Sequence, residues 1–270
     1  MKLSLTASNE LPLVALASLA GRAEAAGLHG LWRAEGVSWD AFTVCALWAE
    51  RTRHIQLATG IVSAITRMPG ALARAAATVT ELSGGRFRLG LGVGNNPEVP
   101  QPKSPLGEIE RVTIAVRDHL RAPLVPEVTQ PAPGIWLAAL RPKMVDLAAR
   151  IADGVLLTWA TPDYVRQVRQ LVGPSYPIAC TVRALAGRRT EGPAELRDHF
   201  EVYRRRPVYQ RHFANQGLDA DRLSDQDLLR FVVRHVDDLE TWRAAGVDEL
   251  VIRPVGDDWW PLIEEFARSR

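Results

Sequence analysis

The chain has little cysteine and no cysteine-based motif. Its 270 residues include two cysteines, Cys45 and Cys180, and neither has a CxxC partner or a metal-like neighbour. This scarcity excludes a disulfide framework, so both are predicted to be buried, reduced thiols of a cytoplasmic protein. An HExxH motif is also missing, and no catalytic metal is expected. The histidines at 119, 199, 212 and 235 fall in predicted helices, on outer faces.

Long apolar runs and one-sided charge are missing as well. No stretch approaches the roughly 18 uninterrupted apolar residues of a membrane span, and residues 1–7 are too short an apolar run for a signal peptide. The formal net charge is +2, and the arginine triplet at 204–206 is typical of a solvated helix face. Neither membrane association nor nucleic-acid binding is expected. The absence of a GxSxG elbow disfavours a serine hydrolase.

Short apolar runs alternate with helical patterns throughout the chain. Strands are predicted at residues 2–7, 30–35, 55–62, 86–93, 135–140, 154–159, 177–183 and 249–253. Two or three helices are expected to fill residues 193–245. Such alternation predicts a parallel sheet with helices outside it. Eight units in 270 residues fit one α/β domain, a closed (β/α)8 TIM barrel over residues 1–270, with an open doubly wound sheet as the alternative.

A glycine-rich stretch, LSGGRFRLGLGVGNN at residues 82–96, is the most informative segment. A helix is predicted to end at Gly84-Gly85, and the following strand leads into a glycine-rich loop. Glycine lets backbone N–H groups approach a ligand closely. The segment is not a Rossmann phosphate loop, because Asn95 replaces the third glycine and prolines follow where a helix should begin.

This stretch resembles the LSGGRF-x-LGLG-x-G phrase of the luciferase-like flavin and F420 oxidoreductases. Three further segments are similar to the same family: IQLATGI at 55–61, WLAALRPKM at 136–144 and AAGVDELVI at 244–252. Together the resemblance runs from about residue 2 to residue 253. The subgroup that the chain resembles most is the F420-dependent one, with methylenetetrahydromethanopterin reductase and F420-dependent glucose-6-phosphate dehydrogenase.

The resemblance implies a cofactor site at the carboxyl ends of the strands, where barrel enzymes hold their active sites. Family members carry a non-proline cis peptide against the deazaflavin, which here would be Gly60–Ile61. The cofactor phosphate would lie at a helix N-terminus, where free N–H groups suit an anion. The implied cofactor residues are Gly60, Ile61, Val62, Gly92, Gly94, Ala138, Ala139, Leu140, Arg141, Thr158 and Arg253.

The acid–base residues of the F420-dependent sugar-phosphate dehydrogenases are only partly present. Their Asp-His pair after the second strand is replaced by Glu35 and Gly36, and their acid after the fourth strand by Asn95. A general acid or base must reach its proton directly or through one water. The candidate catalytic positions are therefore Glu35, Glu10 and Asn95, and a proton from solvent is the alternative. Glu10 also suits a helix N-terminus.

Two residues are candidates for a substrate pocket. Trp159 follows the sixth strand, where its ring either lines the rim or packs within the loop, and Arg183 ends the seventh strand, where it would face an anionic substrate. The first hypothesis is an F420-dependent oxidoreductase that transfers a hydride to or from a small organic substrate. The second is a reduced-FMN monooxygenase, and the third is a cofactor-binding or partner subunit without turnover. The resemblance also implies a homodimer, with helices from residues 40–82 in the contact.

Overall fold

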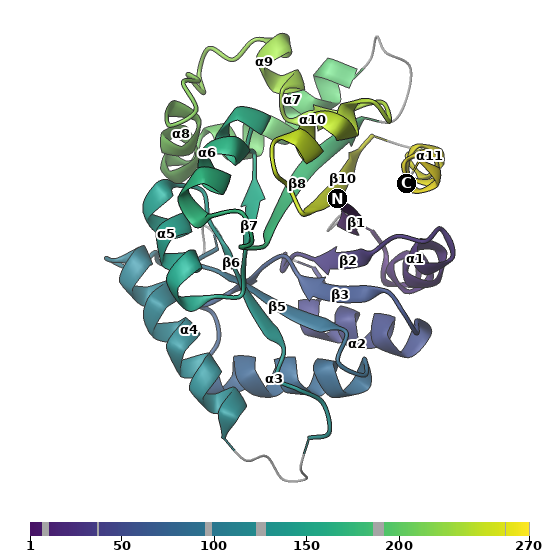
Figure 1. Cartoon of the computed structure of the whole chain (residues 1–270), viewed down its shortest axis with the longest axis vertical. Helices are drawn as coiled ribbons and strands as arrows, with labels where there is room; N and C mark the ends of the chain where they lie inside the picture. The colour runs from purple at the N-terminus through teal and green to yellow at the C-terminus, as the bar shows by residue number, and fades with distance from the viewer. Residues whose placement is uncertain are drawn as a thin grey trace.

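The computed structural model describes residues 1–6, 11–36, 38–94, 99–122, 128–185, 192–256 and 258–269. Eight parallel strands close into a barrel (Figure 1). In order of pairing they are β1 (Lys2–Thr6), β2 (Gly30–Arg33), β3 (Gln56–Thr59), β5 (Phe87–Gly92), β6 (Gly134–Ala138), β7 (Gly154–Thr158), β8 (Ile178–Leu185) and β10 (Glu249–Val255). Strand β10 pairs with both β8 and β1, which closes the barrel. The predicted (β/α)8 barrel is confirmed, and the open doubly wound alternative is wrong.

Helices surround the strands on the outside of the barrel (Figure 1). They are α1 (Leu13–Ala25), α2 (Ala41–Arg51), α3 (Pro69–Leu82), α4 (Pro105–Arg121), α5 (Pro142–Ile151), α6 (Pro162–Val172), α7 (Gly192–Arg204), α8 (Pro207–Ala214), α9 (Asp225–Leu229), α10 (Asp238–Ala244) and α11 (Trp260–Arg268). Local signals start several of them. The Thr161 hydroxyl accepts a hydrogen bond from the Tyr164 N–H at the start of α6, and Pro162 takes the first helical position.

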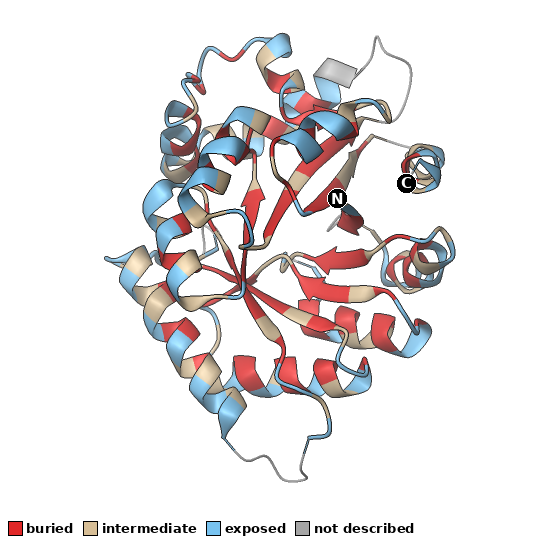
Figure 2. Ribbon diagram, viewed as in Figure 1, coloured by how far each residue is buried: buried red, intermediate tan, exposed pale blue. Residues whose placement is uncertain are grey.

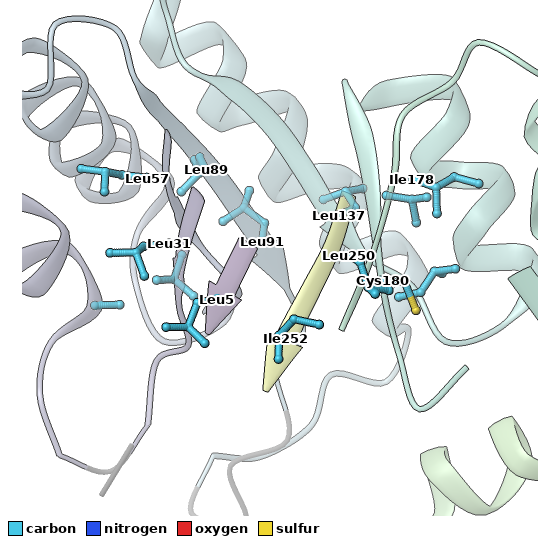
Figure 3. Packing of buried hydrophobic residues seen from close by; sticks show 14 of the residues in the cluster. Leu5, Leu31, Leu57, Leu89, Leu91, Leu137, Ile178, Cys180, Leu250 and Ile252 are labelled. Atoms are coloured by element: carbon cyan, nitrogen blue, oxygen red, sulfur yellow. The ribbon is translucent and has the colours of Figure 1, made fainter. Parts of the chain in front are cut away.

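The larger hydrophobic core lies between the strands and the helices. Figure 2 shows buried residues concentrated on the strands and on the helix faces turned toward them. Because successive strand residues point to opposite faces, one set of side chains faces outward into this core. Figure 3 shows part of that set, which includes Leu5, Leu31, Leu57, Leu89, Leu91, Leu137, Ile178, Cys180, Leu250 and Ile252. Each fully buried leucine or isoleucine contributes about 2 kcal/mol relative to exposure.

Both cysteines belong to this core. Cys45 and Cys180 are buried and free, as predicted. Burial raises the pKa of the Cys45 thiol well above its ordinary value and raises that of Cys180 to about 12. A thiol held in its neutral form is a poor nucleophile, so both cysteines act as small apolar residues.

The barrel interior changes from polar to apolar along its axis. At the amino ends of the strands, the buried Glu249 carboxylate accepts hydrogen bonds from Ser4 Oγ at 2.6 Å, Trp32 Nε1 at 2.7 Å and Arg88 Nη1 at 2.5 Å. Above this network, an interior cluster is formed by Trp32, Ala58, Trp136, Leu156, Ala179 and Val251. The network closes the amino end, which leaves the carboxyl ends of the strands for a ligand.

Two regions differ from the predicted elements. The third strand, predicted over residues 55–62, is divided into β3 and the short β4 (Val62–Ser63), which pairs with β5. After β8, four helices and the short strand β9 (Val232–Val233) replace the predicted two or three helices, within the described residues. The first three of these, α7, α8 and α9, lie together at the top of Figure 1, on the side of β7 and β8, and we call them the α7–α9 unit.

The α7–α9 unit has a hydrophobic cluster of its own. Its members come from the unit, from the segments that follow its helices and from the end of β7: Trp159, Leu196, Phe200, Tyr209, Phe213, Leu218, Ala220, Leu223, Leu228, Phe231 and Val232. Strand β9 joins the cluster to the barrel, because Val232 pairs with Arg183 of β8. The unit therefore covers the β7 and β8 side of the barrel mouth.

Candidate active site

Three neighbouring strand ends form a surface of small residues. The peptide bond between Gly60 and Ile61 is cis, as predicted. Gly92 ends β5 and Ala138 ends β6. A Cβ on Gly92 would lie 3.1 Å from Ile61 Cδ1 and 3.2 Å from Ala138 Cβ, so a side chain there would push these neighbours apart. We call Gly60, Ile61, Gly92 and Ala138 the β3–β6 floor.

The barrel interior supports this floor from below. A Cβ on Gly60 would lie 3.0 Å from Trp32 Cε3 and 3.5 Å from Leu156 Cδ2. Backbone hydrogen bonds add to the packing, because the Gly60 N–H donates to the Arg33 carbonyl at 2.8 Å and the Glu35 N–H donates to the Ile61 carbonyl at 2.9 Å. Packing from below and backbone hydrogen bonds thus fix the position of the floor in the barrel mouth.

The other two residues predicted beside the cofactor ring are placed differently. Val62 is fully buried in the core between strands and helices, so its side chain faces away from the barrel mouth. Gly94 follows β5 with a φ of +80°, and a Cβ there would lie 3.1 Å from Ser63 Oγ. Only the backbone of Val62 can contribute to the mouth, whereas Gly94 allows a close turn at its edge.

The predicted phosphate site lies next to the floor. Helix α5 begins after Arg141, whose backbone is extended, and the side chains of Arg141 and Lys143 are exposed. Ala139 is buried and donates its N–H to the Leu156 carbonyl at 3.1 Å, while the Leu140 carbonyl accepts from the Tyr164 hydroxyl at 3.0 Å. These bonds anchor the turn, and the helix amino end with its two cations stays open to an anion.

Glu35, a predicted catalytic residue, is engaged in structural bonds. Its carboxylate accepts from the Ser63 N–H at 3.0 Å and from Arg67 Nη2 at 2.6 Å and Nε at 3.2 Å. Arg67 also pairs with Asp40 at the start of α2. Glu35 therefore ties the segment after β2 to β4 and to the loop that follows it. The other two candidates, Glu10 and Asn95, lie outside the described residues.

Trp159 and Arg183 lie together, but not at an open rim. Trp159 is 0% exposed and has a φ of +49°. The guanidinium of Arg183 stacks 3.6 Å from the centre of its ring. Arg183 is also buried, and its Nη1 donates to Thr158 Oγ1 at 3.0 Å. The interpretation of Trp159 as a rim aromatic is wrong in this structure, because the α7–α9 unit covers it.

Sequence reasoning missed two histidines beside Trp159. His212 is fully buried, and its Nε2 lies 2.8 Å from the Trp159 carbonyl and 3.1 Å from the Thr158 carbonyl. Because both carbonyls can only accept, we assign the proton to Nε2; the Gln216 amide, 3.1 Å from Nε2, donates to the Trp159 carbonyl instead, at 2.9 Å. His199 stacks against the Trp159 ring with centroids 5.7 Å apart. Burial lowers the pKa of His212 to about 4 and that of His199 to about 2, with Arg183 and Arg253 adding to the latter. The prediction that these two histidines lie on outer helix faces is wrong. The aromatic residues near them in the sequence, Phe200, Tyr203, Tyr209 and Phe213, were the signal that could have indicated a buried cluster.

Two further findings bear on the kind of site. Among the described residues, no group of three histidine, cysteine, aspartate or glutamate side chains is arranged to hold a metal ion. Within the same part of the chain, no helix is both long and apolar enough to cross a membrane.

Sequence comparison identifies a family. The model of the luciferase-like monooxygenase family matches residues 3–103 and 107–174. A proposed coenzyme F420-dependent oxidoreductase of Mycobacterium tuberculosis is 34% identical over 180 residues, which cover 54% of this chain and 51% of that protein. A 5,10-methylenetetrahydromethanopterin reductase of Archaeoglobus fulgidus is 26% identical over 214 residues, which cover 73% of this chain and 58% of the reductase. The chain thus spans little more than half the length of these curated relatives.

Solved structures share the fold over nearly the whole chain. An F420-dependent secondary alcohol dehydrogenase in complex with an F420–acetone adduct has a TM-score of 0.84 at 15% identity, covering 100% of this chain and 98% of the dehydrogenase. The F420-dependent tetrahydromethanopterin reductase of Methanopyrus kandleri has a TM-score of 0.80 at 19% identity, covering 99% and 97%. The FMN complex of a diketocamphane monooxygenase from Pseudomonas putida has a TM-score of 0.73 at 16% identity, covering 99% and 96%.

Proposed function

Because the chain belongs to the luciferase-like monooxygenase family, we propose that it is an F420-dependent oxidoreductase that transfers a hydride between coenzyme F420 and a small organic substrate. The observation that carries this proposal is the β3–β6 floor, with the amino end of α5 beside it. The named relatives from the F420 group support the choice of cofactor. Bound F420 supplies a deazaflavin that accepts or donates a hydride.

The β3–β6 floor fits a flat ring. Gly60, Gly92 and Ala138 bring little or no side chain to the barrel mouth, and the only long side chain of the floor, that of Ile61, packs against Gly92. A Cβ on Gly92 would fill the space that the close packing uses, so the floor depends on the absence of side chains there. Apolar, pre-formed surfaces of this kind are typical of cofactor sites.

The amino end of α5 fits the phosphate of F420. In the proposed complex, Arg141 and Lys143 provide positive charge, and the helix amino end provides N–H donors and the positive end of its dipole. Ala138 and Ala139 allow the backbone to come close, and the Leu140 carbonyl is fixed by Tyr164. Thr158, at the end of the neighbouring strand β7, is within the same part of the mouth.

Proton transfer in the proposed reaction has a smaller set of candidates than the sequence suggested. We assign Glu35 a positioning role, because its carboxylate already accepts from Ser63 and Arg67. Through these bonds Glu35 fixes the position of β4, and of the adjoining Gly60 and Ile61, relative to the end of β2. Glu10 remains a proposed site of proton transfer, and solvent is the alternative source. The carboxamide of Asn95 has no titratable proton, so its proposed role at the catalytic position is limited to hydrogen bonding.

Cofactor titrations test the proposal. We expect purified protein to bind F420 with micromolar or tighter affinity, measured by fluorescence, and FMN more weakly. Gly92→Val should weaken F420 binding by about tenfold or more, because its branched side chain would meet Ile61 and Ala138. The matched control is Gly134→Ala at the opposite end of β6, where a Cβ would meet only ordinary contacts, the nearest at 3.8 Å from Asp153.

The outcomes separate the proposed activity from its alternatives. A preference for FMN would instead favour a reduced-FMN monooxygenase, which would consume oxygen in the presence of a flavin reductase. Failure to bind either cofactor would contradict the proposal and favour a protein without turnover. Equal F420 affinity in Gly92→Val and in the wild type would show that the ring does not lie on the β3–β6 floor.

A further inference from the structure

Two arginines face the barrel mouth from neighbouring strands. Arg183 of β8 and Arg253 of β10 are register partners across the parallel pair. Ala179 and Val251 on the same two strands belong to the interior cluster, and the alternation of side chains puts both arginines on that interior face. In the order of pairing, β8 and β10 lie on the opposite side of the barrel from β3 and β5. The arginine pair therefore faces the β3–β6 floor.

Arg183 is buried without a countercharge among the described residues. Its polar contacts there are Thr158 Oγ1 at 3.0 Å and the Thr181 carbonyl at 3.5 Å, and its Nε has no hydrogen-bond partner. Within the described part of the chain, burial and then the nearby cation of Arg253 lower the pKa of Arg183, whereas the neighbouring Tyr203, Tyr209 and Cys180 raise it. Burial lowers the pKa of Arg183 to about 10, so the guanidinium is still charged at neutral pH.

A buried charge of this kind is costly unless something compensates it. Desolvation of an ion costs several kcal/mol, and proteins normally pair buried charges. The Trp159 ring compensates only in part, because it covers one face of the guanidinium, and the described residues offer no acceptor to its Nε edge. Two more polar atoms beside it, Trp159 Nε1 and His199 Nε2, also have no partner among the described residues.

We propose that Arg183 and Arg253 bind a carboxylate or phosphate group of the substrate. Arg183, which is almost fully buried, provides the directed N–H donors, and the half-buried Arg253 is the member that solvent reaches. The Thr158 hydroxyl accepts from Arg183, so its own proton is available to the same anion. This assignment rests on the proposed function, because it places the substrate opposite the ring. It also moves Arg253 and Thr158 from the cofactor phosphate, where the family resemblance put them, to the substrate.

The first experiment measures anion binding by thermal shift and calorimetry, with inorganic phosphate and malonate as probes and chloride at matched ionic strength. We expect both probes to stabilise the wild type, and Arg183→Met and Arg253→Met to bind them at least about tenfold more weakly. Methionine keeps the unbranched stem against Trp159 while removing the charge. The matched control is Arg166→Gln, which removes an exposed cation paired with Asp163 on α6.

The Tm of Arg183→Met without ligand is a second measurement, and the proposal predicts the direction in which it changes. If the guanidinium is uncompensated until an anion binds, its removal should leave the Tm of the free protein unchanged or higher. A large drop in Tm would show that Arg183 is paired within the protein, and this result would overturn the proposal. The half-buried Arg253→Met variant tests anion binding even if Arg183→Met fails to fold.

F420 titrations of the same variants separate this proposal from the cofactor assignment. Unchanged F420 affinity with lost phosphate binding supports a substrate anion. A parallel loss of both would assign the pair to the cofactor and overturn the substrate assignment. Unchanged phosphate binding in both variants, or none in the wild type, would overturn the site itself. If the wild type binds phosphate through Arg183 but does not bind F420, the cofactor proposal fails and the anion site stands.

Discussion

At the amino end of the barrel, a single carboxylate organises the interior. Glu249 is buried, which opposes its charged form, yet the cation of Arg88 and hydrogen bonds from Ser4 and Trp32 hold its pKa below the ordinary value. Trp32 spans the distance from this carboxylate to the underside of Gly60. One residue far from the barrel mouth thus sets the position of the ring that supports the β3–β6 floor.

Glu249→Gln should destabilise the protein by about 3 kcal/mol, because it leaves Arg88 without its buried partner. The pH dependence should change as well. Because the pKa of Glu249 is lower in the folded state, its ionised carboxylate stabilises the folded protein at pH values above the ordinary pKa of 4.5. This contribution is lost as the pH falls through the lower folded pKa. Urea unfolding of the wild type should therefore show a fall in stability below about pH 4.5 that is smaller in the variant, which keeps the other carboxylates of lowered pKa, such as Asp40. Additive effects in the double variant Glu249→Gln with Arg88→Met would contradict the pairing.

The α7–α9 unit is the element in which packing, and not local pattern, determines the role of the side chains. His212 of α8 donates to the end of β7, and its Nδ1 has no partner among the described residues. A proton on Nδ1 would create a buried charge with nothing to receive it, which is why burial keeps this histidine neutral. Trp159 connects the unit to the barrel through its contacts with Phe200, Phe213 and Phe231.

Acid should loosen this unit before the rest of the molecule. The folded pKa values of His212 and His199, about 4 and about 2, lie below the ordinary value of 6.5. The stability that the two neutral histidines contribute to the folded protein is therefore fully present above pH 6.5. It is lost as the pH falls from 6.5 toward the folded pKa values, by about 1.4 kcal/mol of unfolding free energy per pH unit for each group. Hydrogen exchange at pH 7 and pH 5 should show faster exchange in α7 and α8 than in α3 at the lower pH. A His212→Asn variant with the same difference between the two pH values would refute this role.

For the whole molecule, the remaining expectation is the homodimer. Large apolar side chains are exposed at the starts of α1, α2 and α3: Val14, Trp39 and Met68. The pairing of Arg67 with Asp40 brings the last two near each other, and Trp39 Nε1 donates to the Leu11 carbonyl at 3.1 Å near the start of α1. Exposed apolar clusters are typical of interaction surfaces, so we propose these side chains as the dimer contact.

We expect the wild type to elute with the mass of a dimer in size-exclusion chromatography with light scattering. Met68→Glu combined with Val14→Glu should shift it to the monomer mass, because the contact would have to bury two carboxylates. Leu171→Glu, on the exposed face of α6, is the matched control and should leave the mass unchanged. A wild-type protein that is monomeric at all concentrations would contradict the dimer.

By itself, the sequence determined the barrel, its eight strands and the small residues at their ends. These features depend on local sequence. Apolar runs determine the strands, and prolines and capping residues start the helices. Gly60, Gly92 and Ala138 have little or no side chain whose orientation the fold would have to decide. The tertiary structure alone decided how Trp159, Arg183, His199 and His212 are used, because their burial depends on a unit that packs onto β7 from beyond β8, more than 30 residues away along the chain. The tertiary structure also decided that the Glu35 carboxylate is engaged in hydrogen bonds, since its partners Ser63 and Arg67 come from a different strand and loop. Period and propensity describe neighbours along the chain, whereas charge pairing and burial depend on neighbours in space.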